Sequence, residues 1–203
     1  MTPSADTSIR TLRIVPRAAG LDLSSEDAPL RARWSGPTPR IRKRGLLTEV
    51  SYTAGARLRA LATRHGRLGL TLDRRTPLAL EIAGGVSGLS AELRELDLRE
   101  LVVTGGATHV TLDLPAPTRD LPVRIEGGAS RVTVRRPAGV PVSVAIDGGA
   151  TGLEIDEERL GPMGGQVHAE AAGDGPAIRL RVRGGASDLR VEAAAVRELA
   201  YAL

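Results

Sequence analysis

The stretch EGGASRVTVRRPAGVPVSVAIDGG, residues Glu126 to Gly149, decides the fold of this chain. It opens on one Gly-Gly pair and closes on the next, and two runs of alternating apolar residues lie between the pairs. Alternation with a period of two predicts β-strands that bury one face. The segment Arg136 to Gly139 contains a proline and a glycine, so it predicts a turn between the two strands.

The same unit recurs along the chain. Taking the first glycine of each pair, Gly84, Gly105, Gly127, Gly148 and Gly184 follow one another at steps of 21, 22, 21 and 36 residues. A fixed period of roughly 20 residues is typical of stacked repeat architectures. The last, longer step contains a sixth pair, Gly164-Gly165, and fits either two shorter coils or one coil with an insertion.

Four of the pairs, those that begin at Gly105, Gly127, Gly148 and Gly184, are followed by the pattern G-G-A-[ST]-x-Φ-x-Φ, in which Φ is aliphatic, and are preceded by a second alternating strand. Paired glycines at such a place predict corners, because glycine allows positive φ and the close approach of another backbone. The expected corner residues are Gly84, Gly85, Gly105, Gly106, Gly127, Gly128, Gly148, Gly149, Gly184 and Gly185. The sequence therefore predicts an all-β, single-stranded β-solenoid of stacked coils of about 21 residues with an aliphatic core.

The 203 residues predict one elongated domain rather than two globules. We expect a disordered N-terminus at residues 1–8, the β-solenoid at residues 9–192 and a short helix at residues 193–203. In that last segment Val196, Leu199, Ala200 and Leu203 have helical spacing. Such a helix would cap the end of the solenoid, which otherwise exposes unpaired strand edges.

The repeats GGATHVTLDLP, EGGASRVTVRRPAGVPV and RGGASDLRVE resemble the toastrack family of bacterial β-solenoid domains. That family is related to the C-terminal domains of envelope-stress regulators and to adhesin-like domains. The resemblance covers residues from about Ile9 to Glu192. It implies a bacterial source, an accessory module without shared catalytic residues, and an envelope-stress or regulatory context.

Composition argues against most enzyme classes. The chain has no cysteine, which excludes disulfides and thiolate metal sites. It has no H-E-x-x-H motif, no nucleophile elbow, and no G-K-[ST] after any glycine pair. We expect a protein that is not an enzyme and needs no cofactor or metal. Residues 1–15 lack the features of a secretory signal, and no apolar run has the length of a membrane helix, so a cytoplasmic location is expected.

Charge is unevenly distributed. Residues 1–75 contain 15 Arg and Lys against 6 Asp and Glu, a net charge of +9, and the remainder carries −5. The dense basic cluster and its surroundings are a candidate anion-binding surface: Arg31, Arg33, Trp34, Arg40, Arg42, Lys43 and Arg44. The alternative is a solvated strand end neutralised by Glu49 or Asp73. Stacking aromatics are scarce, which disfavours nucleic acid as the ligand.

The oppositely charged parts of the chain suggest a homo-oligomer formed by head-to-tail contact. The densest acidic stretch contains Asp147, Glu154, Asp156, Glu157 and Glu158. These carboxylates could serve a carbohydrate-active enzyme only if they faced one another across a groove. The leading hypothesis is a non-enzymatic interaction or assembly module with a protein partner. Binding of nucleic acid or another anion by the basic N-terminal face is the alternative, and a carbohydrate-active β-helix enzyme comes third.

Overall fold

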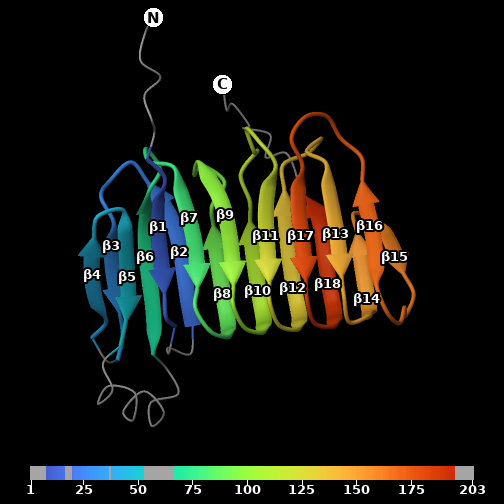
Figure 1. Cartoon of the computed structure of the whole chain (residues 1–203), viewed down its shortest axis with the longest axis horizontal. Coiled ribbons are helices and arrows are strands. Elements are labelled where there is room, and N and C mark those ends of the chain that lie inside the picture. Colours follow the sequence, from blue (N-terminus) through green and yellow to red (C-terminus); the bar gives the residue numbers. More distant parts are fainter. Residues whose placement is uncertain (1–7, 17–19, 37, 53–65, 195–203) are drawn as a thin grey trace, which may run out of the picture.

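The computed structural model describes residues 8–16, 20–36, 38–52 and 66–194. These residues form eighteen β-strands and no helix, in two nine-stranded sheets that pack face to face (Figure 1). The prediction of an all-β, solenoid-like chain is therefore confirmed. No helix in the described residues is long and apolar enough to cross a membrane.

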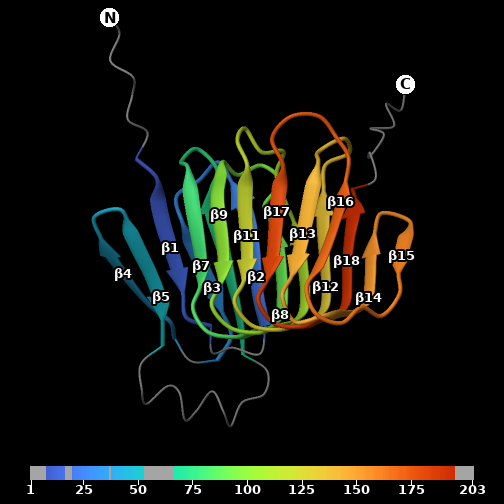
Figure 2. The same cartoon turned by 45° about the vertical axis from the view of Figure 1, so that its right-hand side comes forward.

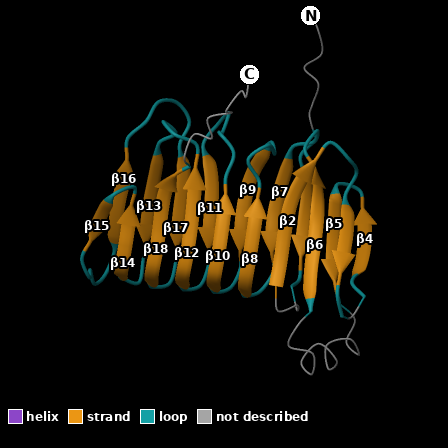
Figure 3. Ribbon diagram, turned by 180° about the vertical axis from the view of Figure 1, so that it is seen from behind, coloured by secondary structure: helices purple, strands orange, loops and turns teal. Residues whose placement is uncertain are grey.

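Sheet A has the order β16-β13-β17-β11-β9-β7-β1-β5-β4, and sheet B has the order β15-β14-β18-β12-β10-β8-β2-β6-β3. The strands of sheet A are β1 (Arg10–Ile14), β4 (Arg40–Arg44), β5 (Leu47–Ser51), β7 (Leu78–Ile82), β9 (Leu98–Val103), β11 (Leu121–Ile125), β13 (Val142–Ile146), β16 (Val167–Ala171) and β17 (Ile178–Val182). Those of sheet B are β2 (Gly20–Glu26), β3 (Arg31–Trp34), β6 (Arg67–Asp73), β8 (Val86–Glu92), β10 (Ala107–Asp113), β12 (Ala129–Arg136), β14 (Ala150–Ile155), β15 (Glu158–Leu160) and β18 (Ala186–Ala193). Figure 3 shows the molecule from the side of sheet B.

The core is a narrow aliphatic layer between the sheets. Parallel pairing aligns equivalent residues of successive coils, as where Val123 of β11 lies between Leu101 of β9 and Leu180 of β17. All three side chains are buried, and each contributes roughly 1.5–3 kcal/mol by leaving water. Short aliphatic side chains suit a layer in which the same position repeats in every coil.

The glycine pairs other than Gly164-Gly165 lie where the chain passes from a strand of sheet A to a strand of sheet B. Here the backbones of neighbouring coils touch. A Cβ atom on Gly105 would lie 2.5 Å from the backbone nitrogen of Gly85, and one on Gly127 would lie 2.7 Å from that of Gly106. Crowding, rather than positive φ, is the reason for glycine at these two positions.

A column of left-handed residues follows the corners. In sheet B the residue after the [ST] position has positive φ in five neighbouring strands: Gly88, His109, Arg131, Asp188 and Gly152. The parallel registers skip these residues, so each strand carries the same kink at the same place. His109 is exposed there, and its Nε2 lies 2.6 Å from Nη1 of Arg131.

The coils are not stacked in sequence order, which differs from the arrangement expected of a simple solenoid. The pair β17/β18 lies between β11/β12 and β13/β14, and the pair β1/β2 lies between β5/β6 and β7/β8. The first coil of the described chain, β1/β2, and the last, β17/β18, are therefore each separated from the nearer end of the stack by another coil. The outermost coils come from internal sequence.

Each end of the stack is closed by two antiparallel strands. At one end β4 pairs with β5 and β3 pairs with β6, and at the other β16 pairs with β13 and β15 pairs with β14. The pair Gly164-Gly165 lies between β15 and β16, so the long step is one coil with an insertion. The insertion is itself the cap (Figure 2).

The expected C-terminal capping helix is not seen. Strand β18 continues to Ala193, where the helix was expected to begin, and residues 195–203 lie outside the described residues, as do residues 1–7. The cap at that end is formed by β15 and β16, because β18 lies inside the stack and does not reach its end. The expected division into residues 1–8, 9–192 and 193–203 otherwise stays a prediction.

A buried arginine links β18, the second strand of the β17/β18 coil, to its neighbours in the stack. Arg136, at the end of β12, is 3% exposed. Its Nη1 donates to the carbonyl of Val140 at 2.7 Å, and its Nη2 donates to Oδ2 of Asp156 at 2.6 Å. Oδ1 of Asp156 accepts from the backbone nitrogen of Ala193 at 3.0 Å. One ion pair thus joins β12, the turn after β14 and the end of β18.

Candidate functional site at the two ends of the stack

The basic cluster forms one end of the molecule, which we name the basic end: Arg31, Arg33 and Trp34 on β3, and Arg40, Arg42, Lys43 and Arg44 on β4. These strands are the last of sheet B and of sheet A at the same end of the stack (Figure 1). Two segments that are separate in sequence thus supply one surface. Every charged residue in this set is exposed.

Strand register divides the basic end into an inner face, which carries Trp34, Ile41 and Lys43, and an outer face of arginines. Trp34 is opposite buried Leu68 and Ile41 is opposite buried Val50, so both face the inside of the sandwich. Trp34 nevertheless remains 46% exposed and Ile41 43% exposed, because the stack ends there. The alternate residues Arg31 and Arg33 on β3, and three arginines of β4, face the outside.

The cations of the basic end have no ion-pair partner among the described residues, whereas fourteen other arginines pair with carboxylates. The two carboxylates expected to neutralise them are engaged elsewhere. Asp73 accepts hydrogen bonds from Arg75, and Glu49 accepts one from Oγ of Ser51 at 3.2 Å. Glu49 is opposite Arg42 in the register, without an ion pair between them.

The opposite end carries the reverse charge. Glu157 and Glu158, in the turn after β14 and on β15, and Glu170 on β16 are exposed and have no ion-pair partner in the described chain. We name these three residues the acidic end. Arg159, which lies between them, is neutralised by Glu154 at 3.3 Å.

The acidic stretch does not form a pair of opposed catalytic carboxylates. Asp147 pairs with Arg181 at 3.1 Å, Glu154 pairs with Arg159 and Arg190, and Asp156 pairs with Arg136. Asp156 is in a turn with φ 53°, beyond the end of β14. In the described ranges, no three His, Asp or Glu residues are grouped so that they could hold a metal ion.

The run from Arg40 to Arg44 marks the basic end in the sequence. The acidic end has no such mark: Glu170 is isolated in the sequence, and Glu157 and Glu158 belong to a longer acidic stretch. These residues reach one end of the stack only because β17/β18 lies between β11/β12 and β13/β14. The inward orientation of Ile41 was visible in the alternation of β4, but only pairing with Val50 fixes it.

Comparisons with known proteins agree with this architecture. Residues 56–135 match the model of the N-terminal domain of toast_rack, DUF2154. The structure superimposes on the crystal structure of a "putative cell adhesion protein" from Clostridium sporogenes with a TM-score of 0.68 and 16% sequence identity, over 93% of this chain and 95% of that one. No curated protein matches the sequence. The resemblance carried by the glycine-pair repeats is confirmed, and the likeness to the solved structure shows the fold.

Proposed function

We propose that this toastrack-type chain is a non-enzymatic interaction module whose copies assemble head to tail, with the basic end of one molecule against the acidic end of the next. The observation that carries the proposal is the charge left unpaired at opposite ends of the stack. Complementary charge of this kind steers association and fixes orientation. The adhesion role named for the C. sporogenes protein is compatible with an interaction module.

Strand direction supports end-on contact. Within each sheet both cap strands run opposite to the coils between them. Two molecules stacked in the same orientation would place β16 beside β4 and β15 beside β3, each as a parallel pair. Ile41 would then adjoin β16, whose inner face carries Ala169 and Ala171, opposite Val144 and Val142. Trp34 would adjoin β15, whose inner face carries Leu160, opposite buried Leu153, and Glu158. Repeated head-to-tail contacts form a closed ring when the rotation between neighbouring molecules brings the last one back to the first. Otherwise they form an open filament.

The test is sedimentation velocity at micromolar protein concentration in low and high salt. We expect association at low salt that weakens as the salt is raised, because exposed charges are screened over about 10 Å at 0.1 M ionic strength. The double substitution Arg40→Glu with Arg42→Glu should give a monomer. Reversing two paired arginines on the face of sheet A, Arg179→Glu with Arg181→Glu, is the matched control.

A second variant makes the test specific. Glu158→Arg with Glu170→Arg should also be monomeric, and mixing the two monomeric variants should restore association. A monomer at low salt, or an oligomer that ignores both the salt and the Arg40 and Arg42 reversals, would contradict head-to-tail assembly.

Anion binding is the second candidate, and the exposed cations of β3 and β4, which have no ion-pair partner among the described residues, favour it. An acidic polymer such as duplex DNA would contact the cations of the basic end, and its affinity would fall steeply with salt. No binding at low salt would remove this candidate. The cytoplasmic location and the envelope-stress or regulatory context stay predictions.

A further inference from the structure

A cavity of about 230 Å³ lies next to the basic end, between the two sheets. Its apolar wall includes Leu12 of β1, Leu72 of β6, Leu78 of β7 and Leu30, which precedes β3. Leu12, Leu72 and Leu78 are at most 9% exposed, and Leu30 packs against the core. The volume corresponds to about eight groups of the size of a water molecule, which is enough for a short aliphatic chain.

Lys43 lies at the wall of this cavity. It is opposite Thr48 in the β4–β5 register, and Thr48 is beside buried Leu12 in the β5–β1 register. The three residues therefore share the inner face of sheet A, so Lys43 faces the inside of the sandwich. The neighbouring Arg42 and Arg44 face the outside and do not line the cavity.

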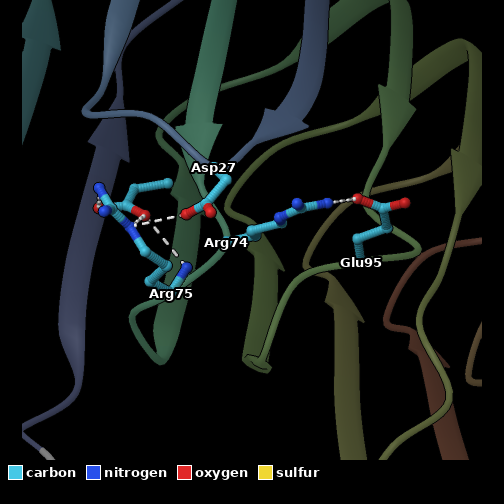
Figure 4. Close-up of polar contacts among 5 residues, drawn as sticks. Asp27, Arg74, Arg75 and Glu95 are labelled. Carbon is cyan, nitrogen blue, oxygen red and sulfur yellow. Dashed lines mark hydrogen bonds and ion pairs between the residues drawn. The ribbon is translucent and has the colours of Figure 1, made fainter.

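The charge at the cavity is positive. Arg10 and Lys43 line it and have no ion-pair partner in the described part of the chain. The carboxylate that also lines it, Asp73, accepts from the backbone nitrogen of Arg75 at 3.1 Å and from its Nε at 3.0 Å. Nε of Arg75 also lies 2.9 Å from Oδ1 of Asp27 (Figure 4). These hydrogen bonds hold the pKa of Asp73 below its ordinary value, so the carboxylate stays ionised and paired.

We propose that this cavity binds a small aliphatic carboxylate, with the hydrocarbon chain among the leucines and the carboxylate on the Lys43 ammonium. The four leucines suit a hydrocarbon chain better than a sugar or a nucleotide, because Thr11, Thr48 and Thr76, which also line the cavity, offer too few partners for the many polar groups of such a ligand. The unpaired cations disfavour an amine. Lys43 belongs to the basic end as well, but it faces the inside of the sandwich. The assembly proposal is tested on the outward-facing Arg40 and Arg42, so the two proposals can fail separately.

Isothermal titration with octanoate tests the site, and octanol and octylamine serve as the neutral and cationic analogues. We expect one octanoate per chain, weaker binding of octanol and no binding of octylamine. Lys43→Met should weaken octanoate binding by about tenfold or more, the effect of losing a charge-assisted hydrogen bond. Arg44→Met removes the same charge from the outer face of the same strand, and it should leave the affinity within about twofold.

Leu30→Trp fills the cavity and should abolish binding while circular dichroism shows the strands intact. The proposal is overturned if octanoate fails to bind in the low millimolar range, or if Leu30→Trp still binds. It is also overturned if Lys43→Met and Arg44→Met change the affinity equally, since that result would assign binding to the general charge of the basic end.

Discussion

The two glycines of a corner have different tasks. In four of the pairs the first glycine lies against the backbone of a neighbouring coil, as Gly127 does against Gly106; these are Gly105, Gly127, Gly148 and Gly184. The second has more room, because a Cβ atom on Gly128 would lie 3.4 Å from the nearest atom, the carbonyl oxygen of Gly185. Backbone atoms in a ladder of hydrogen-bonded coils move less readily than side chains. The two positions should therefore differ in their tolerance of a methyl group.

Gly127→Ala should lower the free energy of unfolding by about 1–3 kcal/mol, the usual cost of inserting a group into packed structure. Gly128→Ala, one residue along, should cost under about 1 kcal/mol. Urea unfolding of the two variants measures the difference directly. Equal destabilisation would mean that crowding at the first position is relieved by movement of the whole corner.

Asp120 makes stability depend on pH. Its carboxylate accepts from the backbone nitrogen of Ala177 at 3.0 Å and from Nε of Arg179 at 2.7 Å, and these two bonds lower its pKa from the ordinary 3.8. The unfolded chain therefore takes up the proton first as the pH falls. The stabilisation is complete above the ordinary pKa and is lost as the pH falls through the lowered one. Asp120→Asn should destabilise the protein at pH 7, and the difference from the wild type should disappear in acid, as measured by denaturant unfolding at each pH.

At the scale of the strand, five neighbouring strands of sheet B have a kink at the same position, and the residue there is left-handed whatever its type. Glycine occupies two of its five positions, and His109, Arg131 and Asp188 occupy the others. A left-handed conformation costs a residue with a Cβ atom roughly 1–2 kcal/mol. Three strands of sheet B therefore hold strain that the glycine-containing strands avoid.

Arg131→Gly should raise the free energy of unfolding by up to about 1 kcal/mol, because relief of strain exceeds the entropy that glycine gains in the unfolded chain. Thr133→Gly, on the extended part of the same strand, should lower it by about 0.5–1 kcal/mol. Thermal unfolding of the two variants distinguishes a conformational effect from a general effect of glycine. A lower stability for Arg131→Gly would show that the side chain contributes more than the strain removes.

Alternation and glycine pairs predicted the strands of the repeat, since each coil needs inward aliphatic residues at the same places. They could not predict which coils are neighbours. Ala186 lies between Ala129 on one neighbouring strand and Ala150 on the other. All three alanines occupy the same position of the same motif. Backbone pairing would accept any order. Contacts outside the motif distinguish the coils, and sequence spacing does not reveal pairs such as Arg136 with Asp156 or Asp120 with Arg179.

For the whole molecule, the inserted coils tie distant parts of the chain together. In a simple solenoid, removing the last coil leaves the others intact, because each coil contacts only its neighbours. Here β17 and β18 lie between β11/β12 and β13/β14, so their removal separates the end of the stack from its centre. The acidic end depends on the same arrangement. Residues 157–170 form the end of the stack, and the later strands β17 and β18 lie between the coils β11/β12 and β13/β14.

A chain truncated after Asp174 should therefore lose the folded state rather than one coil. The missing strands leave unpaired edges within the stack, and the buried Arg136 loses the packing of β18 beside it. Circular dichroism and urea unfolding measure the loss, and a chain that ends at Ala194 and keeps β18 is the control. Cooperative unfolding of the truncated chain at near-native stability would contradict the insertion.

The inserted coils also define how the molecule would carry a mechanical load. The described chain enters the stack at β1 and leaves it at β18, and both points lie at the same edge (Figure 1). Tension between them would pass through the coils β1/β2, β7/β8, β9/β10, β11/β12 and β17/β18. The outer coils, with the basic and acidic ends, lie outside that path. A molecule pulled by its two ends would keep its contact surfaces relaxed while its centre bears the force.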